Sequence, residues 1–142
     1  GMTVDVAPVT SRPSLSGYDA VVLCSAIRMS VWLGDMMDFV KANQAALKKV
    51  PVALVTLHIL NTGDDEASRA ARLAYTAPVR QLLSPVEDVF FAGKIDYSTL
   101  SFLDRLMAKA VEQQTGTPPG DYRDWNAMRA WANDTLAQKL VG

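Results

Sequence analysis

The chain has 142 residues, of which 49% are hydrophobic, and its 14 basic and 15 acidic residues leave a net charge of -1. This length and composition suit one domain that closes a single core without disulfides or a metal. A nearly neutral chain offers no general field that would attract DNA, RNA or anionic lipid, so we expect no nucleic-acid partner. The longest apolar run is far shorter than the roughly 20 residues that cross a bilayer, so we expect no membrane span.

The first residues of the chain and its one cysteine bear on the bounds of the domain and on its cellular compartment. Gly1 before Met2 has the look of a residue left by tag removal, so we place a single domain at residues 3–141. No signal peptide is visible at the N-terminus. Cys24 is the only cysteine and stands in an apolar run, so we expect it to be a small buried side chain. A lone cysteine suits a reducing compartment, and we predict a cytoplasmic location.

Strand-like and helix-like segments alternate in the first half of the chain. Thr3–Val9 alternates apolar and polar residues, which is typical of a short strand near a sheet edge. Tyr18–Ile27 is a continuous apolar run that predicts a strand buried on both faces. Apolar residues then recur at helical spacing over residues 30–49, so we expect an amphipathic helix with Ser30 as its N-cap.

The alternation continues in the second half and predicts a parallel sheet. We expect strands at Val52–Leu60 and Pro85–Ala92. We expect helices from near Asp64 to Leu83, with a kink or a break at Pro78, over Phe102–Val111 and over Asp124–Leu140. Asp121 and Asp124, just before the last helix, fit the role of N-terminal caps. Strands alternating with helices indicate βαβ units, whose ligands bind outside the carboxyl ends of the strands. The loops after Ile27, Leu60 and Ala92 should therefore share one rim.

Three ordered segments carry a resemblance to a known family. They are SLSGYDAVVLCSAIRMSVWL at residues 14–33, AGKIDYSTLSFLDRLM at residues 92–107 and DYRDWNAMRAWA at residues 121–132. The sequence resembles the flavodoxin family, in particular the branch related to the oxygen-independent protoporphyrinogen oxidases, from Val4 to nearly its end. The resemblance implies an α/β fold with three layers around a flavodoxin-like parallel sheet ordered 2-1-3-4-5, which binds flavin mononucleotide (FMN) where the strand order switches.

In this comparison the chain lacks the first strand and first helix of the fold. Thr3–Val9 matches the family's second strand, which usually follows about 35 further residues. Those residues include the family's Ser/Thr-rich loop, which presents backbone N–H groups to the FMN phosphate. Thr10, Ser11 and Ser14 follow the wrong strand to replace that loop. We therefore expect any FMN affinity to be weak.

The two family loops that flank the flavin ring are both present. The resemblance assigns ring contacts to the following residues of this chain: Ser25, Ala26, Ile27, Arg28, Met29 and Trp32 in the first loop, and Thr56, Leu57, His58 and Ile59 in the second. Trp32 either stacks on the ring or packs against a neighbouring loop. His58 either contacts the ring or is a hydrogen-bonded structural residue, and as a metal ligand it lacks a companion at ligand spacing.

Two functions remain open on these residues. One is a flavoprotein of electron-transfer or oxidoreductase type, with a redox partner or a porphyrinogen-like substrate, in which the protein places the flavin and tunes its potential. The alternative is a flavin-free remnant of the fold that acts as an oligomerising binding module. Because a missing central strand leaves a sheet edge open, we also predict a homodimer with its contact near Thr3–Val9 and Tyr18–Ile27. No motif of a hydrolase, a nucleotide triphosphatase or a thioredoxin is present.

Overall fold

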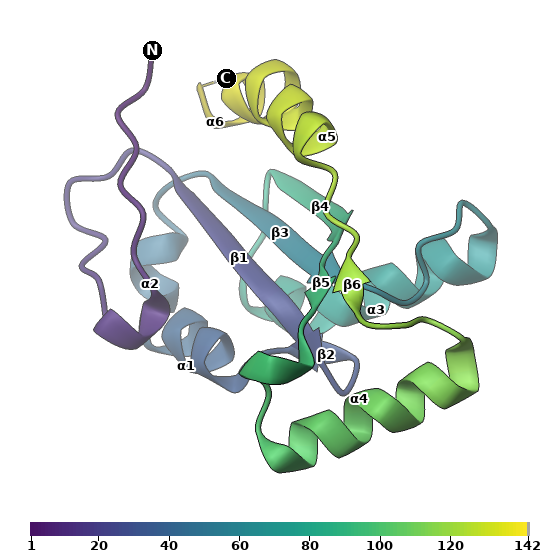
Figure 1. Ribbon diagram of the computed structural model, residues 1–142. Helices are drawn as coiled ribbons and strands as arrows, with labels where there is room; N and C mark the ends of the chain where they lie inside the picture. The colour runs from purple at the N-terminus through teal and green to yellow at the C-terminus, as the bar shows by residue number, and fades with distance from the viewer. Residues whose placement is uncertain (142) are drawn as a thin grey trace.

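A mixed sheet of four strands forms the centre of the computed structural model, which describes residues 1–141. Its strand order is β2-β1-β3-β4. β1 (Val21–Arg28), β3 (Val52–His58) and β4 (Glu87–Ala92) are parallel, and the two-residue β2 (Val31–Trp32) runs antiparallel to the end of β1. The carboxyl ends of the three parallel strands therefore lie at one rim of the sheet (Figure 1).

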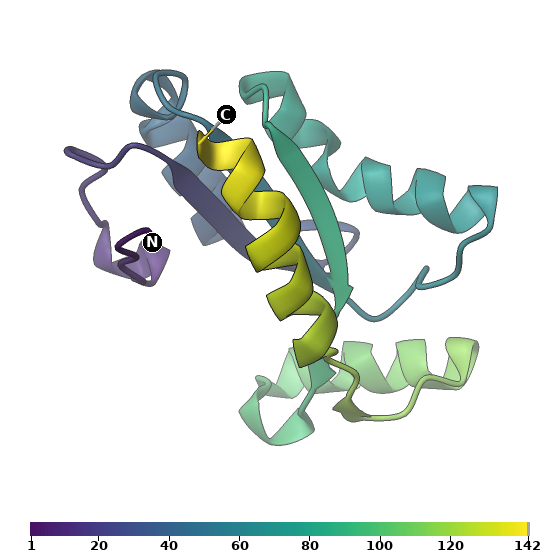
Figure 2. The same ribbon diagram turned by 90° about the horizontal axis from the view of Figure 1, so that it is seen from above.

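Helices lie on both sides of this sheet, which confirms the three-layer α/β prediction. α1 (Gly34–Ala42), α2 (Gln44–Leu47) and α3 (Glu66–Leu82) lie on one side. The last helical segment lies across the opposite side (Figure 2). It consists of α5 (Trp125–Ala130), a π-helical stretch (Trp131–Leu136) and α6 (Ala137–Val141). Among the described residues no helix is long and apolar enough to cross a bilayer.

The residues between the end of β4 and the start of α5 form a separate segment outside the four-stranded sheet. It contains β5 (Lys94–Ile95), a 3-10 turn (Tyr97–Thr99), α4 (Phe102–Thr115) and β6 (Gly120–Asp121). β5 and β6 pair antiparallel, so the two ends of this segment lie side by side. The sequence predicted α4 but not the β5–β6 pair, because two-residue strands have no periodicity to detect.

The main hydrophobic cluster lies on one side of the sheet, and on the other side Ala53 and Val55 of β3 are also buried. Leu23, Val52 and Leu54 point to the side of the main cluster and pack against α1, α2 and α3, through Met36, Phe39, Val40, Leu47 and Val79 among others. The residues of β1 that alternate with Leu23 point the other way, and they are exposed, with Val22 at 43%. We call this surface, made of Val22, Cys24 and Ala26, the open face of β1.

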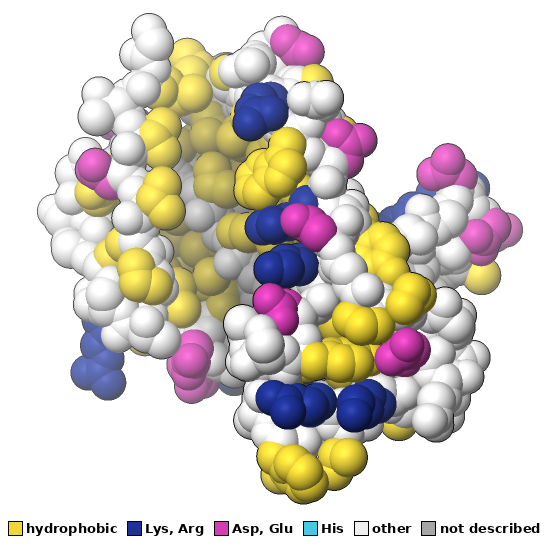
Figure 3. All heavy atoms as spheres, viewed as in Figure 1, with side chains coloured by type: hydrophobic (Ala, Val, Ile, Leu, Met, Phe, Trp, Pro, Cys, Tyr) yellow, Lys and Arg dark blue, Asp and Glu magenta, His cyan; other side chains and the backbone are white. Residues whose placement is uncertain are grey.

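The prediction that β1 and Cys24 are buried on all sides was therefore wrong. The last helical segment contacts the β4 end of this side, where Trp131 meets Phe91 edge to face at 5.7 Å between ring centres. It does not extend over β1, and the space-filling view shows a hollow floored by hydrophobic side chains at this place (Figure 3). An apolar run alone does not reveal whether a helix is available to cover each face.

Two element predictions near the start of the chain were also wrong. Thr3–Val9 forms no strand; the segment is exposed and ends in a 3-10 turn at Val9–Ser11. No described strand lies beside it for pairing. The hydroxyl of Tyr18 donates a hydrogen bond of 2.8 Å to the carboxylate of Asp5, and this bond holds the segment outside the sheet. The helix expected over residues 30–49 is instead β2, α1 and α2, because a tight turn follows β1 and the helix begins only at Gly34.

The expected helix starts are confirmed in part. Asp65 caps α3 by accepting the N–H of Ser68, and Asp124 caps α5 by accepting the N–H of Ala127. Asp121 does not cap a helix, because its carboxylate is held by Arg123 in a salt bridge of 2.6 Å. Pro78 lies inside α3 without ending it.

A pair of substitutions on adjacent strands tests the one-sided core. Leu54 is fully buried, so Leu54→Ala should lower the free energy of unfolding by about 2–5 kcal/mol through lost burial and a cavity. Val22→Ala on the open face should lower it by less than about 1 kcal/mol. Urea denaturation of both variants measures this difference, and equal losses would show that the face of β1 is covered in solution.

Candidate functional site

A tight hairpin joins β1 to β2 at the rim of the sheet. Met29 and Ser30 form its turn with φ angles of 52° and 63°, and both values lie in the left-handed region that non-glycine residues seldom adopt. Ile27 and Arg28 pair with Trp32 and Val31 on either side of the turn. Backbone held in such a conformation is concentrated at ligand clamps and functional turns, which makes this hairpin a candidate for ligand contact.

Buried hydrogen bonds fix the hairpin to the next strand. The indole Nε1 of Trp32 donates to the hydroxyl of Thr56 at 2.9 Å, and both side chains are almost completely buried. The hydroxyl of Ser25 accepts the N–H of Leu33 at 3.2 Å, just before α1 begins. The first predicted loop is therefore attached directly to the second, because Ser25 and Thr56 are also paired across β1 and β3.

His58 closes the end of β3 and is a structural residue in this arrangement. Its Nδ1 lies 2.6 Å from the carbonyl oxygen of Leu60, so Nδ1 carries the proton and donates it. The ring is 6% exposed and lies between the rings of Tyr75 and Phe90, at 5.9 and 6.1 Å between centres. Burial lowers the pKa of His58 below its usual 6.5, so the neutral imidazole is favoured.

Residues from two helices hold the rim loops in place, and the sequence did not point to them. From α3, Arg72 donates to the carbonyl oxygens of Asn61 and Gly63, while Asn61 donates to the hydroxyl of Tyr75 at 2.7 Å. From α4, Asp104 forms a salt bridge of 2.6 Å with Arg28 of the first loop. These partners are distant in sequence from the loops, so no spacing rule could have identified them.

The predicted site residues meet at the rim, but they differ in exposure. Ala26, Arg28 and Met29 are exposed, Ile27, Leu57 and Ile59 are half-buried, and Ser25, Trp32, Thr56 and His58 are buried. The four buried side chains pack and hydrogen-bond within the protein. Of the two alternatives for Trp32, packing therefore describes its position, since a side chain at 2% exposure has no free face for stacking. A ligand at this rim would contact the exposed residues and the loop backbone.

The described residues contain no cradle for the FMN phosphate. A phosphate usually binds the free N–H groups at a helix N-terminus, where the dipole favours negative charge. Each of the four longer helix starts already holds a carboxylate at its N-cap or in its first turn, and these are Asp35 in α1, Asp65 in α3, Asp104 in α4 and Asp124 in α5. A second anion would be repelled there. The residues present therefore do not fit the phosphate.

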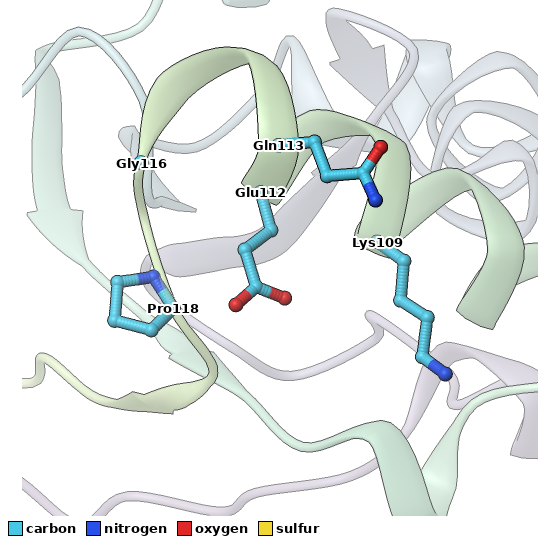
Figure 4. A pocket seen from close by; sticks show the side chains of 5 residues that line it. All are labelled: Lys109, Glu112, Gln113, Gly116 and Pro118. Atoms are coloured by element: carbon cyan, nitrogen blue, oxygen red, sulfur yellow. The ribbon is translucent and has the colours of Figure 1, made fainter.

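Two surface hollows, one of which includes the predicted residue His58, add no catalytic group. One has a volume of about 440 Å³ and lies beside the end of α4 (Figure 4). Its Glu112 is already bound by the hydroxyl of Tyr97, and this contact raises the pKa of Tyr97 to about 12. The other, of about 360 Å³, includes His58 and Asp88 behind the rim. Within residues 1–141 no group of three or more His, Cys, Asp or Glu side chains is placed to hold a metal ion.

The comparison with known families agrees with this fold. A family model described as a flavodoxin domain matches residues 1–120, which is most of the chain. The chain belongs to the flavodoxin family. The central parallel sheet of this flavodoxin-like protein, with helices on both sides, is the architecture that the resemblance implied. At the level of the family, this places it among flavoproteins of oxidoreductase type.

One curated relative of this flavodoxin-like protein has a named activity. The chain is 27% identical over 134 residues to a protein of Leishmania major named protoporphyrinogen IX dehydrogenase [quinone]. The match covers 89% of this chain and 58% of the relative, so the chain spans little more than half of that protein. The activity in that name belongs to the relative.

Replacing Thr56 by side chains of similar shape tests the hydrogen bond between Trp32 and Thr56. Thr56→Val removes the acceptor and leaves the buried indole N–H unpaired, which should cost about 1–3 kcal/mol of unfolding free energy. Thr56→Ser keeps a hydroxyl and should cost clearly less. Chemical denaturation measures both variants, and a Val variant as stable as the Ser variant would contradict the role of this bond.

The pKa of His58 should make stability depend on pH. The pKa of His58 is 6.5 in its unperturbed form and lower in the folded protein. As the pH falls below about 7, the unfolded chain takes up this proton first, so the free energy of unfolding should decrease until the pH reaches the folded pKa. Because His58 is the only histidine, its ring proton resonances report that pKa directly. His58→Asn should remove the slope, and a folded pKa above 6.5 would refute the prediction.

Proposed function

We propose that this chain is an electron-transfer flavoprotein of the flavodoxin type in which the protein contacts the flavin ring and not the phosphate. The observation that supports the proposal most is the fixed hairpin turn at Met29 and Ser30, which lies beside the end of β3 at the rim. Its backbone is held by Ser25 and Trp32, so ring contacts would require no reorganisation. When bound, the flavin would supply the two-electron chemistry.

The residues of the rim have distinct parts in this proposal. The backbone of residues 26–29 and 57–59 contacts the edge of the ring, and Met29, which is 78% exposed, covers part of its face. Arg28 is kept in place by Asp104, whose carboxylate largely balances the guanidinium charge, so Arg28 would place N–H donors beside the ring and add little net charge there.

The name of the Leishmania major relative suggests the class of substrate. We propose that the electron donor is a porphyrinogen-like tetrapyrrole and that the acceptor is a quinone or a protein redox partner. The exposed apolar residues of the first loop, with Met29 foremost, suit a large flat substrate of this kind. We further propose that the first strand, phosphate loop and first helix of the fold are absent from this chain, since residues 1–141 supply no counterpart.

Comparison of two flavins tests the proposal. FMN and riboflavin share the ring and differ in the phosphate, so this chain should bind both with dissociation constants that agree within about threefold. Quenching of flavin fluorescence during titration measures the two constants. Met29→Glu should weaken both flavins alike, because it places a charge in the ring contact, whereas Leu73→Glu at an exposed position of α3 should change neither.

Two outcomes would contradict the proposal. A strong preference for FMN would show that the chain does hold the phosphate, which the carboxylates at its helix starts argue against. Binding of neither flavin would remove the electron-transfer function and leave the rim without a cofactor. If flavin binds, reoxidation of the reduced complex by a soluble quinone, followed by absorbance, tests the proposed acceptor.

A further inference from the structure

The open face of β1 is an apolar surface that the chain itself leaves uncovered. Parallel strands are normally covered on both faces, because their side chains are hydrophobic on both. Here the side chains of Val22, Cys24 and Ala26 are exposed. β1 lies between the N-terminal segment and the last helical segment (Figure 1), and the space-filling view from the same side shows a hollow floored by hydrophobic side chains (Figure 3). The hollow is open to solvent along β1.

α4 carries a second uncovered apolar surface on the same chain. Phe102, Leu103, Leu106 and Met107 are exposed at 73, 69, 51 and 41%. Their spacing of one, three and four residues places them on one side of the helix. The other side is attached to the protein, since Asp104 binds Arg28 and the guanidinium of Arg105 donates to the carbonyl oxygen of Tyr97 at 3.0 Å. We call these four residues the apolar side of α4.

We propose that the chain forms a two-fold symmetric dimer in which the apolar side of α4 from each copy packs on the open face of β1 of the other. A convex helix is the element that covers a sheet face in α/β proteins, and α4 is the described helix whose large hydrophobic side chains are most exposed. The net charge of -1 per copy gives little repulsion between two copies. This inference concerns assembly and does not depend on flavin binding.

Two-fold symmetry follows from the small size of each contact. One helix on one strand face covers much less than the roughly 1,600 Å² of a standard interface. A two-fold arrangement makes the contact twice within one dimer and closes the assembly, whereas a one-sided contact would leave a free α4 and a free β1 face at the ends. Both apolar surfaces of both copies are covered only in the closed form.

Pairing between the edges of two β1 strands explains the surfaces less well. β2 already occupies the edge at Ile27 and Arg28, so a regular partner strand would meet Trp32 there. Edge pairing would also place the two open faces side by side and leave both exposed to water. Packing of α4 on the face removes that exposure.

Sedimentation velocity on matched variants tests the dimer. The unmodified chain should sediment as a dimer, and Leu106→Asp in α4 or Val22→Asp in the open face should each weaken the dimer by about 30-fold or more. Leu73→Asp is the control, because Leu73 is 48% exposed on α3, against 51% for Leu106 on α4. This control should leave the dimer intact. Circular dichroism establishes that each variant is folded.

Cys24 gives an independent readout of whether the open face of β1 is covered. As the only cysteine, it should react with a maleimide about tenfold or more slowly in the unmodified chain than in Leu106→Asp, at a concentration where the unmodified chain sediments as a dimer and Leu106→Asp as a monomer, because the dimer covers it.

Three results would overturn the proposal. The first is a monomer at all concentrations, and the second is a dimer of the unmodified chain in which Cys24 is labelled as fast as in monomeric Leu106→Asp. The third is a dimer that Val22→Asp weakens but Leu106→Asp does not, which would show that another segment covers the face.

Discussion

The parallel pairing of β1 with β3 is the interaction on which the rest of the structure depends. It places Leu23 beside Leu54 on the core side and Ser25 beside Thr56 near the rim, in one continuous register. From this pairing the hairpin turn, the start of α1 and the loop after β3 all take their positions. The hydrogen bond from Trp32 to Thr56 extends the same register into β2, so core and rim belong to one cooperative unit.

That register also divides the molecule into a packed side and an uncovered side. On the packed side three helices exclude water from Leu54, Val40 and Val79, which are fully buried. On the other side the last helical segment reaches Phe91 through Trp131 but leaves β1 exposed. Most of the stability should therefore come from one interface, since the free energy of burial scales with the apolar area removed from water.

The sequence predicted the elements that have strong local signals. It failed for features whose burial or pairing depends on another segment of the protein. The apolar runs of β1 and β3, the acidic cap of α3 and the periodicity of α4 each lie within a few residues of one another, so they are visible without the fold. Burial of Cys24 depended on a covering helix, and the strand expected at Thr3–Val9 depended on a neighbouring strand. Neither partner is present. The turn at Met29 and Ser30 was missed because left-handed backbone usually calls for Gly or Asn, and neither residue stands there.

The predicted site residues show the same difference between local signals and contacts with distant partners. The resemblance named residues that lie together at one rim, because Ser25 and Thr56 are paired there, but it did not separate exposed side chains from those that lock the loops. Trp32 and His58 are the clearest cases. Each is an amphipathic ring of the type that often binds cofactors, and each has its polar atom bonded inside the protein, to Thr56 and to Leu60.

The proposed absence of the first family unit would account for both unusual surfaces of this chain. In the resemblance, the first strand of a flavodoxin pairs within the sheet, the loop after it holds the phosphate, and the first helix packs on the sheet. Without that unit, residues 1–141 would have neither a phosphate cradle nor a helix over the face of β1. The rim does not depend on such a unit, because Ser25, Trp32 and Thr56 hold it within β1, β2 and β3. The open face of β1 has no such local support, since the described helices leave it exposed.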